Sequence, residues 1–200
     1  MATIELNETD LRRRRPVWAA LSDLFLDTEV RPLVVTASAA CLSSGYSDQE
    51  LQTIWRHEVS PVLAKNLLAT PGGEWSGFDP DWLEAEILQR RPKVTDRLWA
   101  RLNLKSWNEV CRLRTWLSTW PTSDRDHVVR SVEALTRSAY DETPAFPEDM
   151  PNVATEVLER IWKEGAAPLI SALHIRGNEA PVKDFLERGR QALQRVLKER

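Results

Sequence analysis

Helix start and stop signals recur along the whole chain, and they constrain its fold more than any other feature. Ser47-Asp48-Gln49-Glu50 has the pattern of a capping box, in which a serine hydroxyl and a glutamate carboxylate satisfy amide groups at a helix start. Ser106-Trp107-Asn108-Glu109 repeats this pattern, and Asp79-Pro80 joins a capping residue to a proline suited to a first helical turn. No segment between these signals alternates apolar and polar residues over the length of a strand. The pattern therefore predicts an all-α multi-helix bundle of roughly nine or ten helices.

Prolines and one glycine divide this pattern into individual helices. Pro16, Pro32 and Pro61 are each expected in the first turn of a helix, where a missing amide hydrogen breaks no hydrogen bond. Gly45 is expected to end the helix that Pro32 begins, because glycine adopts the left-handed conformation of a helix terminus without strain. These positions set the expected helix boundaries in the N-terminal part of the chain.

A weak internal resemblance suggests how the helices are grouped. Two stretches share residue types in the same order at one constant offset: Leu51, Ile54, Trp55 and Pro61 correspond to Leu158, Ile161, Trp162 and Pro168. Two tandem helical halves, 13–91 and 93–200, would explain this similarity. Chance is the alternative, because two helices joined at a proline are common, and the halves then form one continuous domain.

Composition places the chain among folded proteins and argues against several partners. Its 200 residues are 42% hydrophobic and 28% charged, which is typical of a globular protein with a substantial core. Lys and Arg number 27 against 30 Asp and Glu, and this net charge of −3 disfavours a general nucleic-acid binder. The longest stretch of low polarity, 33–42, is about half a membrane span. Nothing near the N-terminus resembles the apolar core of a signal peptide, so we expect a cytoplasmic protein that makes no membrane contact.

The histidines and cysteines form no recognisable catalytic or metal-binding pattern. His57-Glu58 lacks the second histidine, four residues later, that a zinc-protease helix requires. Gly73-Glu74-Trp75-Ser76-Gly77 has the wrong spacing for a nucleophile elbow, and no strand is expected before it. Cys41 and Cys111 lie in apolar helical patterns and are expected to be small buried side chains. We therefore expect no enzyme activity, no catalytic residue, no metal and no cofactor.

Two acidic segments with interleaved aromatic residues are the features most indicative of function. Residues 74–86 and 141–159 contain several carboxylates and neither Lys nor Arg. Carboxylates speed the encounter with a basic protein, and rigid aromatic side chains supply buried contact area. The residues predicted to bind a partner are Glu74, Trp75, Asp79, Asp81, Asp141, Glu142, Glu148 and Asp149.

The aromatic residues of the first acidic segment and a run of arginines near the N-terminus also have a purely structural interpretation. Trp82 continues an apolar helix face with Ile87, so we expect it to be buried, whereas for Trp75 burial and exposure stay open. The run Arg12–Arg15 could hold an anion or RNA, but the acidic residues just before it dilute its charge. We expect this run to be a solvated lead-in to a helix.

Three blocks of sequence carry a resemblance to a known family. They are residues 15–29 (RPVWxALSxLFLDTE), 58–67 (EVxPVLxxNL) and 73–83 (GEWxGFDxxWL). Together they resemble an uncharacterised bacterial all-helical family, a domain of unknown function, over residues 13–91. The resemblance implies a helical fold and carries no activity, cofactor or catalytic residue with it.

The expected function is therefore binding to another protein. The most concrete form is an immunity protein or antitoxin that neutralises a basic bacterial toxin through the acidic-aromatic segments. A self-associating helical scaffold is one alternative, in which exposed apolar faces pack against a second copy. A regulator, or an enzyme of unrecognised type, is the other.

Overall fold

The computed structural model describes residues 6–26, 29–68, 76–91, 93–139, 154–172 and 179–198. Within these ranges every regular element is helical, which confirms the all-α prediction. Contacts within the chain group it into two compact units, Met1–Asn108 and Glu109–Arg200. A compact unit need not fold independently, so the predicted domains 13–91 and 93–200 stay a prediction.

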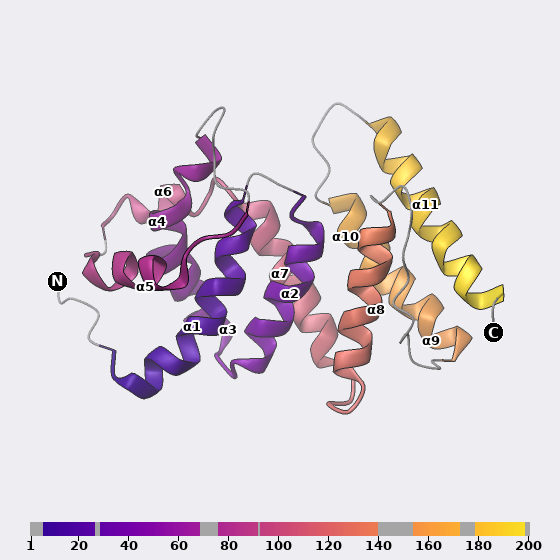
Figure 1. The fold of residues 1–200 in the computed structure, drawn as a ribbon, viewed down its shortest axis with the longest axis horizontal. Helices are drawn as coiled ribbons and strands as arrows, with labels where there is room; N and C mark the ends of the chain where they lie inside the picture. Colours follow the sequence, from indigo (N-terminus) through magenta and orange to yellow (C-terminus); the bar gives the residue numbers. More distant parts are fainter. Residues whose placement is uncertain are drawn as a thin grey trace. The chain divides into compact units, whose positions relative to one another are not determined.

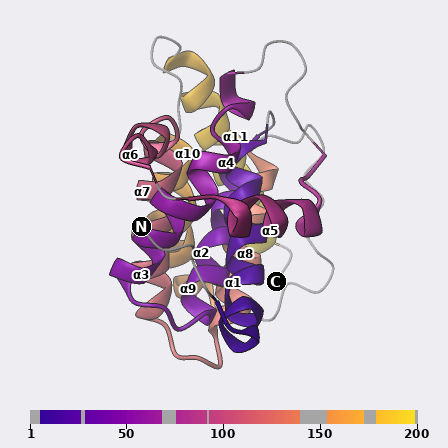
Figure 2. The same cartoon turned by 90° about the vertical axis from the view of Figure 1, so that its left-hand side faces the viewer.

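The first unit holds most of the N-terminal helices (Figure 1). They are α1 (Glu8–Ser22), the 3-10 turn η1 (Asp23–Phe25), α2 (Arg31–Ser43), α3 (Asp48–Thr53), the π-helical segment η2 (Ile54–Val59), α4 (Ser60–Leu63), the 3-10 turn η3 (Asn66–Leu68), α5 (Pro80–Gln89), α6 (Asp96–Trp99) and the start of α7 (Leu104–Ser118). α1 packs along α2, and it also contacts η2 and α5; Figures 1 and 2 show α1, α2 and α5.

The second unit contains the rest of α7 and the remaining helices (Figure 1). They are α8 (Arg125–Ser138), α9 (Thr155–Arg160), the π-helical segment η4 (Ile161–Ala166), α10 (Ala167–Ala172) and α11 (Glu179–Lys198). η4 packs on α8, and α11 contacts α8, α9 and α10. When each continuous α–π–α run is taken as one helix, the described part of the chain forms nine helices, as predicted.

Helix caps decide several of these boundaries. The capping box at Ser47 is confirmed: the Glu50 amide donates to Ser47 Oγ at 3.3 Å, and the Ser47 amide donates to Glu50 Oε2 at 2.8 Å. Gly45 has a φ of +69°, which confirms it as the left-handed residue after α2. The second predicted box is wrong, because Ser106 lies inside α7 and is buried. The Asn103 carbonyl already accepts the Trp107 amide, so the helix begins before Ser106.

Pro16 does not begin a helix, contrary to expectation. α1 begins about two turns before it, at Glu8, and Oδ1 of the capping residue Asn7 accepts the Asp10 amide at 2.9 Å. Pro16 is exposed within α1, so its ring faces away from the buried residues of the helix. The arginine run 12–15 is consequently part of α1 rather than a lead-in to it.

Pro61 also lies within a continuous helical run, because a π turn precedes it. The Ser60 amide donates to the carbonyl of Trp55, five residues earlier, as in a π turn. Pro61 has no amide hydrogen, and in an α-helix its ring would collide with the carbonyl four residues earlier. The wider π turn separates these groups, so α3, η2 and α4 form one uninterrupted helix.

The second unit repeats this arrangement at the offset seen in the sequence. α9, η4 and α10 follow one another without a break, and the Ala167 amide donates to the carbonyl of Trp162. Pro168 stands where Pro61 stands in the first run. The weak sequence resemblance therefore corresponds to the same local structure, a helix that widens into a π turn just before a proline.

Stacked aromatic rings form the centre of the first core. Trp55 lies between Phe25 and Trp107, with ring centroids 5.1 Å apart on both sides. Cys41, on α2, is fully buried, as predicted, whereas Cys111 is only half-buried. Because Trp55 belongs to η2, the π turn places a large ring at the middle of this unit.

Candidate functional site

The described part of the acidic-aromatic segment is the N-terminal end of α5. Asp79 caps this helix, since its Oδ1 accepts the Trp82 amide at 2.7 Å, and Pro80 follows in the first turn, as predicted. Asp81 lies in that first turn and is exposed. Carboxylates at this end are favoured by the partial positive charge of a helix N-terminus. Both carboxylates face solvent, and Asp79 also has a structural role.

Trp82 is exposed, contrary to the expectation that it would be buried. Its exposed fraction is 44%, whereas Leu83 and Ile87 on the same helix are buried. Phe78 stacks on Trp82 with ring centroids 6.2 Å apart. Leu83 and Ile87 are four residues apart and form the buried face of α5, and Trp82 lies outside this face. The result is a pair of aromatic rings at the surface beside two carboxylates, which we call the α5 patch (Phe78, Asp79, Asp81 and Trp82).

Glu84, also on α5, is held by an arginine. Arg15 donates to it twice, from Nε at 2.7 Å and from Nη2 at 3.0 Å. This two-pronged ion pair joins α1 to α5 and removes Glu84 from the carboxylates available to a partner. The hydrogen bond from Arg15 lowers the pKa of Glu84 below its ordinary value.

The Glu84 ion pair predicts a pH-dependent contribution to stability. Replacing Glu84 with Gln is expected to destabilise the protein only where the carboxylate is charged. A lowered pKa in the folded state adds stability above the ordinary carboxyl pKa of about 4.3, and that stability is lost as the pH falls through the folded-state value. Urea unfolding of both proteins at several pH values tests this. A difference that is the same at low and neutral pH would contradict it.

Six of the eight predicted partner-binding residues lie outside the described residues. They are Glu74, Trp75, Asp141, Glu142, Glu148 and Asp149. Their assignment stays a prediction from sequence. The structure describes only Asp79 and Asp81 of the original set, and it adds Phe78 and Trp82 to them.

Three arginines of the run in α1 contact other segments of the fold, while the fourth, Arg12, is 76% exposed and, among the described residues, pairs only with Glu8. Arg13 donates to the Ser44 carbonyl at 3.2 Å and lies over the Tyr46 ring, 4.2 Å from its centroid. Arg14 forms an ion pair with Glu58, and Arg15 is bound to Glu84. These contacts leave the run little free positive charge for an anion or RNA.

Two buried carboxylates that the sequence did not single out organise the first unit. Glu58 is 2% exposed; it forms an ion pair with Arg14 and accepts a hydrogen bond from Trp18 Nε1 at 2.7 Å. Asp96 is fully buried, pairs with Arg90 and accepts the Lys93 amide at 2.9 Å. Burial without these partners would be costly, so both carboxylates serve the fold.

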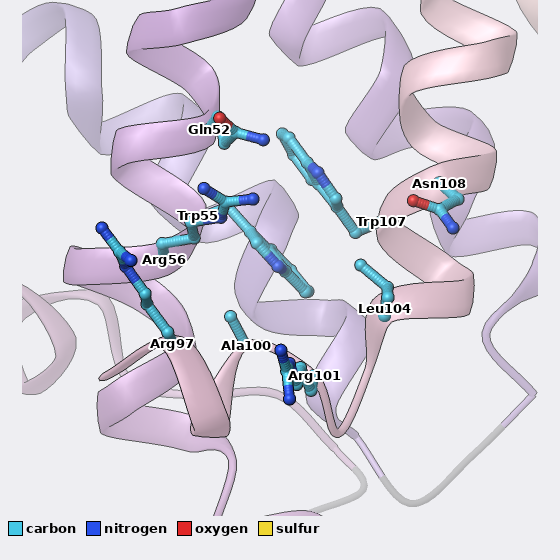
Figure 3. A pocket seen from close by; sticks show the side chains of 9 residues that line it. All are labelled: Gln52, Trp55, Arg56, Arg97, Ala100, Arg101, Leu104, Trp107 and Asn108. Carbon is cyan, nitrogen blue, oxygen red and sulfur yellow. The ribbon is translucent and has the colours of Figure 1, made fainter. Parts of the chain in front are cut away.

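A second candidate site is a cavity of about 460 Å³ in the first unit (Figure 3). Figure 3 shows Arg56, Arg97 and Arg101 grouped around the ring of Trp55, with Trp107 beyond it. None of the described residues that line this cavity is a carboxylate. Among the described residues, Trp55 Nε1 is buried and has no hydrogen-bond acceptor, which costs about 1–3 kcal/mol. We call this cavity the arginine pocket.

The sequence offered no clear signal for the arginine pocket. Arg56 comes from η2, while Arg97 and Arg101 come from α6 and the turn after it. These segments are separated in sequence, and each arginine alone resembles an ordinary surface residue. The only available clue was the four-residue spacing of Arg97 and Arg101, which places two side chains on one helical face.

Two properties of the described residues limit the kinds of site they form. They contain no cluster of three or more histidines, cysteines or carboxylates arranged to hold a metal ion. None of their helices is both long enough and apolar enough to cross a membrane.

Comparison with known proteins identifies a family without an assigned activity. A family model described as a domain of unknown function, DUF7079, matches residues 12–132. The match continues well past residue 91, where the sequence resemblance was expected to end, and it includes the α5 patch and the arginine pocket. No curated protein and no solved structure matches the chain. The chain therefore belongs to the DUF7079 family of domains of unknown function.

Proposed function

We propose that this protein is a non-enzymatic binding protein that holds a basic protein partner through the α5 patch. Its most concrete form is an immunity protein or antitoxin that covers the cationic active site of a toxin. The proposed setting is the cytoplasm, where the toxin would otherwise act on its substrate.

The exposed Trp82 is the observation that carries this proposal. A tryptophan that is 44% exposed and stacked on Phe78 leaves a rigid apolar surface in contact with water. Tryptophan is enriched among the residues that contribute most to protein interfaces, because it buries a large area with little loss of side-chain freedom. A partner that covers this ring pair would recover the free energy of that exposed surface.

Charge supports a basic partner. Asp81 is exposed and has no ion-pair partner among the described residues, and Glu86 on the same helix is likewise exposed and unpaired. Glu84 is the exception, since Arg15 already neutralises it. Opposite charge on the partner would speed association and reject acidic proteins.

The test has two steps: the unaltered protein is used to capture a partner, and the partner's binding to a double variant, Asp81→Lys with Trp82→Ala, is then measured. Both side chains are exposed, so the variant is expected to fold, and Asp79 is left intact because it caps α5. We expect the variant to bind the captured protein about tenfold more weakly or worse, measured with the purified partner by calorimetry.

A matched control separates local binding from a general effect of charge. Asp126→Lys with Val94→Ala changes another exposed first-turn carboxylate, on α8, and another exposed apolar side chain. This control is expected to bind as the unaltered protein does. Equal binding by the Asp81/Trp82 variant, or a captured protein that is acidic, would refute the proposal.

A further inference from the structure

The arginine pocket has the dimensions and lining of a small-molecule site. Its volume of about 460 Å³ lies within the range of about 300–1,000 Å³ that is usual for ligand pockets. Three guanidinium groups line it together with the side-chain amides of Gln52 and Asn108. With three positive charges and no carboxylate among its described residues, the lining favours an anion.

The three arginines are available because the fold does not engage them. Among the described residues, the side chains of Arg56, Arg97 and Arg101 have neither an ion pair nor a hydrogen bond, and no carboxylate lies in the lining of the pocket to neutralise them. By contrast, two other arginines of the first unit are paired with buried carboxylates, Arg14 with Glu58 and Arg90 with Asp96. Each free guanidinium offers a planar set of donors that matches the oxygens of a phosphate or carboxylate.

The rest of the lining indicates what the anion is attached to. Trp55 and Trp107 also line the pocket, but their stacked rings are almost fully buried, whereas Leu104 is 44% exposed and supplies apolar surface beside the arginines (Figure 3). An inorganic ion would leave the exposed surface of Leu104 uncovered. A ligand with a charged group and an apolar or planar body would use both parts of the lining.

The π turn contributes directly to this site. Trp55 and Arg56 are consecutive residues of η2, and both line the pocket. Single π turns within α-helices are often found at functional sites, because the extra residue changes the direction of neighbouring side chains. Here the turn places Trp55 in the core and Arg56 at the pocket.

We propose that the arginine pocket binds a small organic phosphate. A phosphate ester carries up to two negative charges and three free oxygens, which suits three arginines better than a single carboxylate does. A nucleic-acid strand is disfavoured, because the whole chain has a net charge of −3 and lacks the basic excess needed to follow a phosphate backbone. This site is separate in its residues from the α5 patch.

The second unit provides an internal comparison. At the offset of the repeated run, Gln52, Trp55 and Arg56 correspond to Glu159, Trp162 and Lys163. These three residues also line a cavity, of about 350 Å³, in the second unit. The carboxylate of Glu159 in that lining would repel a phosphate, so we expect binding in the first unit only.

Calorimetry with the full chain tests the proposal directly. The probes are adenosine monophosphate, glucose 6-phosphate, inorganic phosphate and a short single-stranded RNA. We expect at least one of the two organic phosphates to bind more tightly than inorganic phosphate and than the RNA. The double variant Arg56→Gln with Arg101→Gln should weaken this binding about tenfold or more, because two of three charged donors are lost.

The matched control is Lys163→Gln with Arg190→Gln, which removes two cations from the cavity of the second unit. It should leave organic phosphate binding unchanged, and circular dichroism checks that both variants stay helical. The proposal fails if neither organic phosphate binds, if inorganic phosphate or RNA binds more tightly, or if the two variants weaken binding equally.

Discussion

Replacing Glu58 with alanine is expected to lower the free energy of unfolding by about 3–5 kcal/mol, because it removes one partner of a buried ion pair. Glu58 is 2% exposed, and it neutralises Arg14, whose side chain is also largely buried. The same carboxylate accepts the hydrogen bond of Trp18 Nε1 at 2.7 Å. The variant would leave a charged donor and a buried ring N–H without an acceptor. Urea unfolding followed by circular dichroism measures the loss.

Two further variants show that the effect depends on buried charge. Glu58→Gln keeps an oxygen for Trp18 but not the negative charge for Arg14, so we expect an intermediate loss. Glu8→Ala removes a carboxylate that is 60% exposed and also paired with arginines of α1, and it should cost less than about 1 kcal/mol. Equal losses for Glu58→Ala and Glu8→Ala would show that the Glu58 network does not stabilise the unit.

The second large effect is expected at Gly165, which we propose to replace with leucine. A Cβ atom at this position would lie 3.0 Å from the Trp116 ring and 3.0 Å from a Val132 methyl group. Leucine would place further carbon atoms in a space that is already filled. Overpacking of this kind typically costs about 1–3 kcal/mol, and we expect the upper end here because the first added atom already meets two side chains.

The control for Gly165→Leu is Ala172→Leu, at an exposed position of α10. It should change the free energy of unfolding by less than about 0.5 kcal/mol, because the added side chain extends into solvent. If both variants unfold at the same urea concentration, the close packing of η4 against α8 is not important for stability.

Glu58 and Gly165 occupy the same position in the two π turns, and this correspondence shows what sequence reasoning can and cannot reach. The constant offset was visible from Trp55 and Pro61 and their counterparts, because apolar residues and prolines follow the helix geometry directly. The roles of Glu58 and Gly165 depend on which side chains lie opposite them. Those neighbours come from other helices, so a local pattern carries no information about them.

Local capping chemistry explains most of the successful predictions. Ser47, Gly45 and Asp79 were correctly placed at helix ends because their partners lie within a few residues. The predicted capping box at Ser106 was wrong because the chain is already helical before this residue. The prediction for Pro16 was wrong because the turn before it is already helical, whereas Pro61 does lie in the first turn of α4, which continues the π turn before it.

The candidate site was predictable only in part. Asp79 and Asp81 are exposed, as a binding role requires, but Trp82 was assigned to the core because its spacing from Ile87 also suits a buried face. The true phase of α5 is set by Leu83 and Ile87 together. The arginine pocket depends on two segments that meet only in the folded unit, so its residues had no common signal in the sequence.

The most direct test of the binding role is to place a photo-cross-linking benzoylphenylalanine at position 82 and to identify what it captures in cells. Its aromatic ring keeps the apolar surface of Trp82. The same amino acid at position 94, where Val94 is 89% exposed, is the control. The account predicts a cross-link from position 82, and not from position 94, to a protein with a basic surface. No cross-linked protein at position 82, a second copy of this chain, or equal labelling from both positions would contradict it.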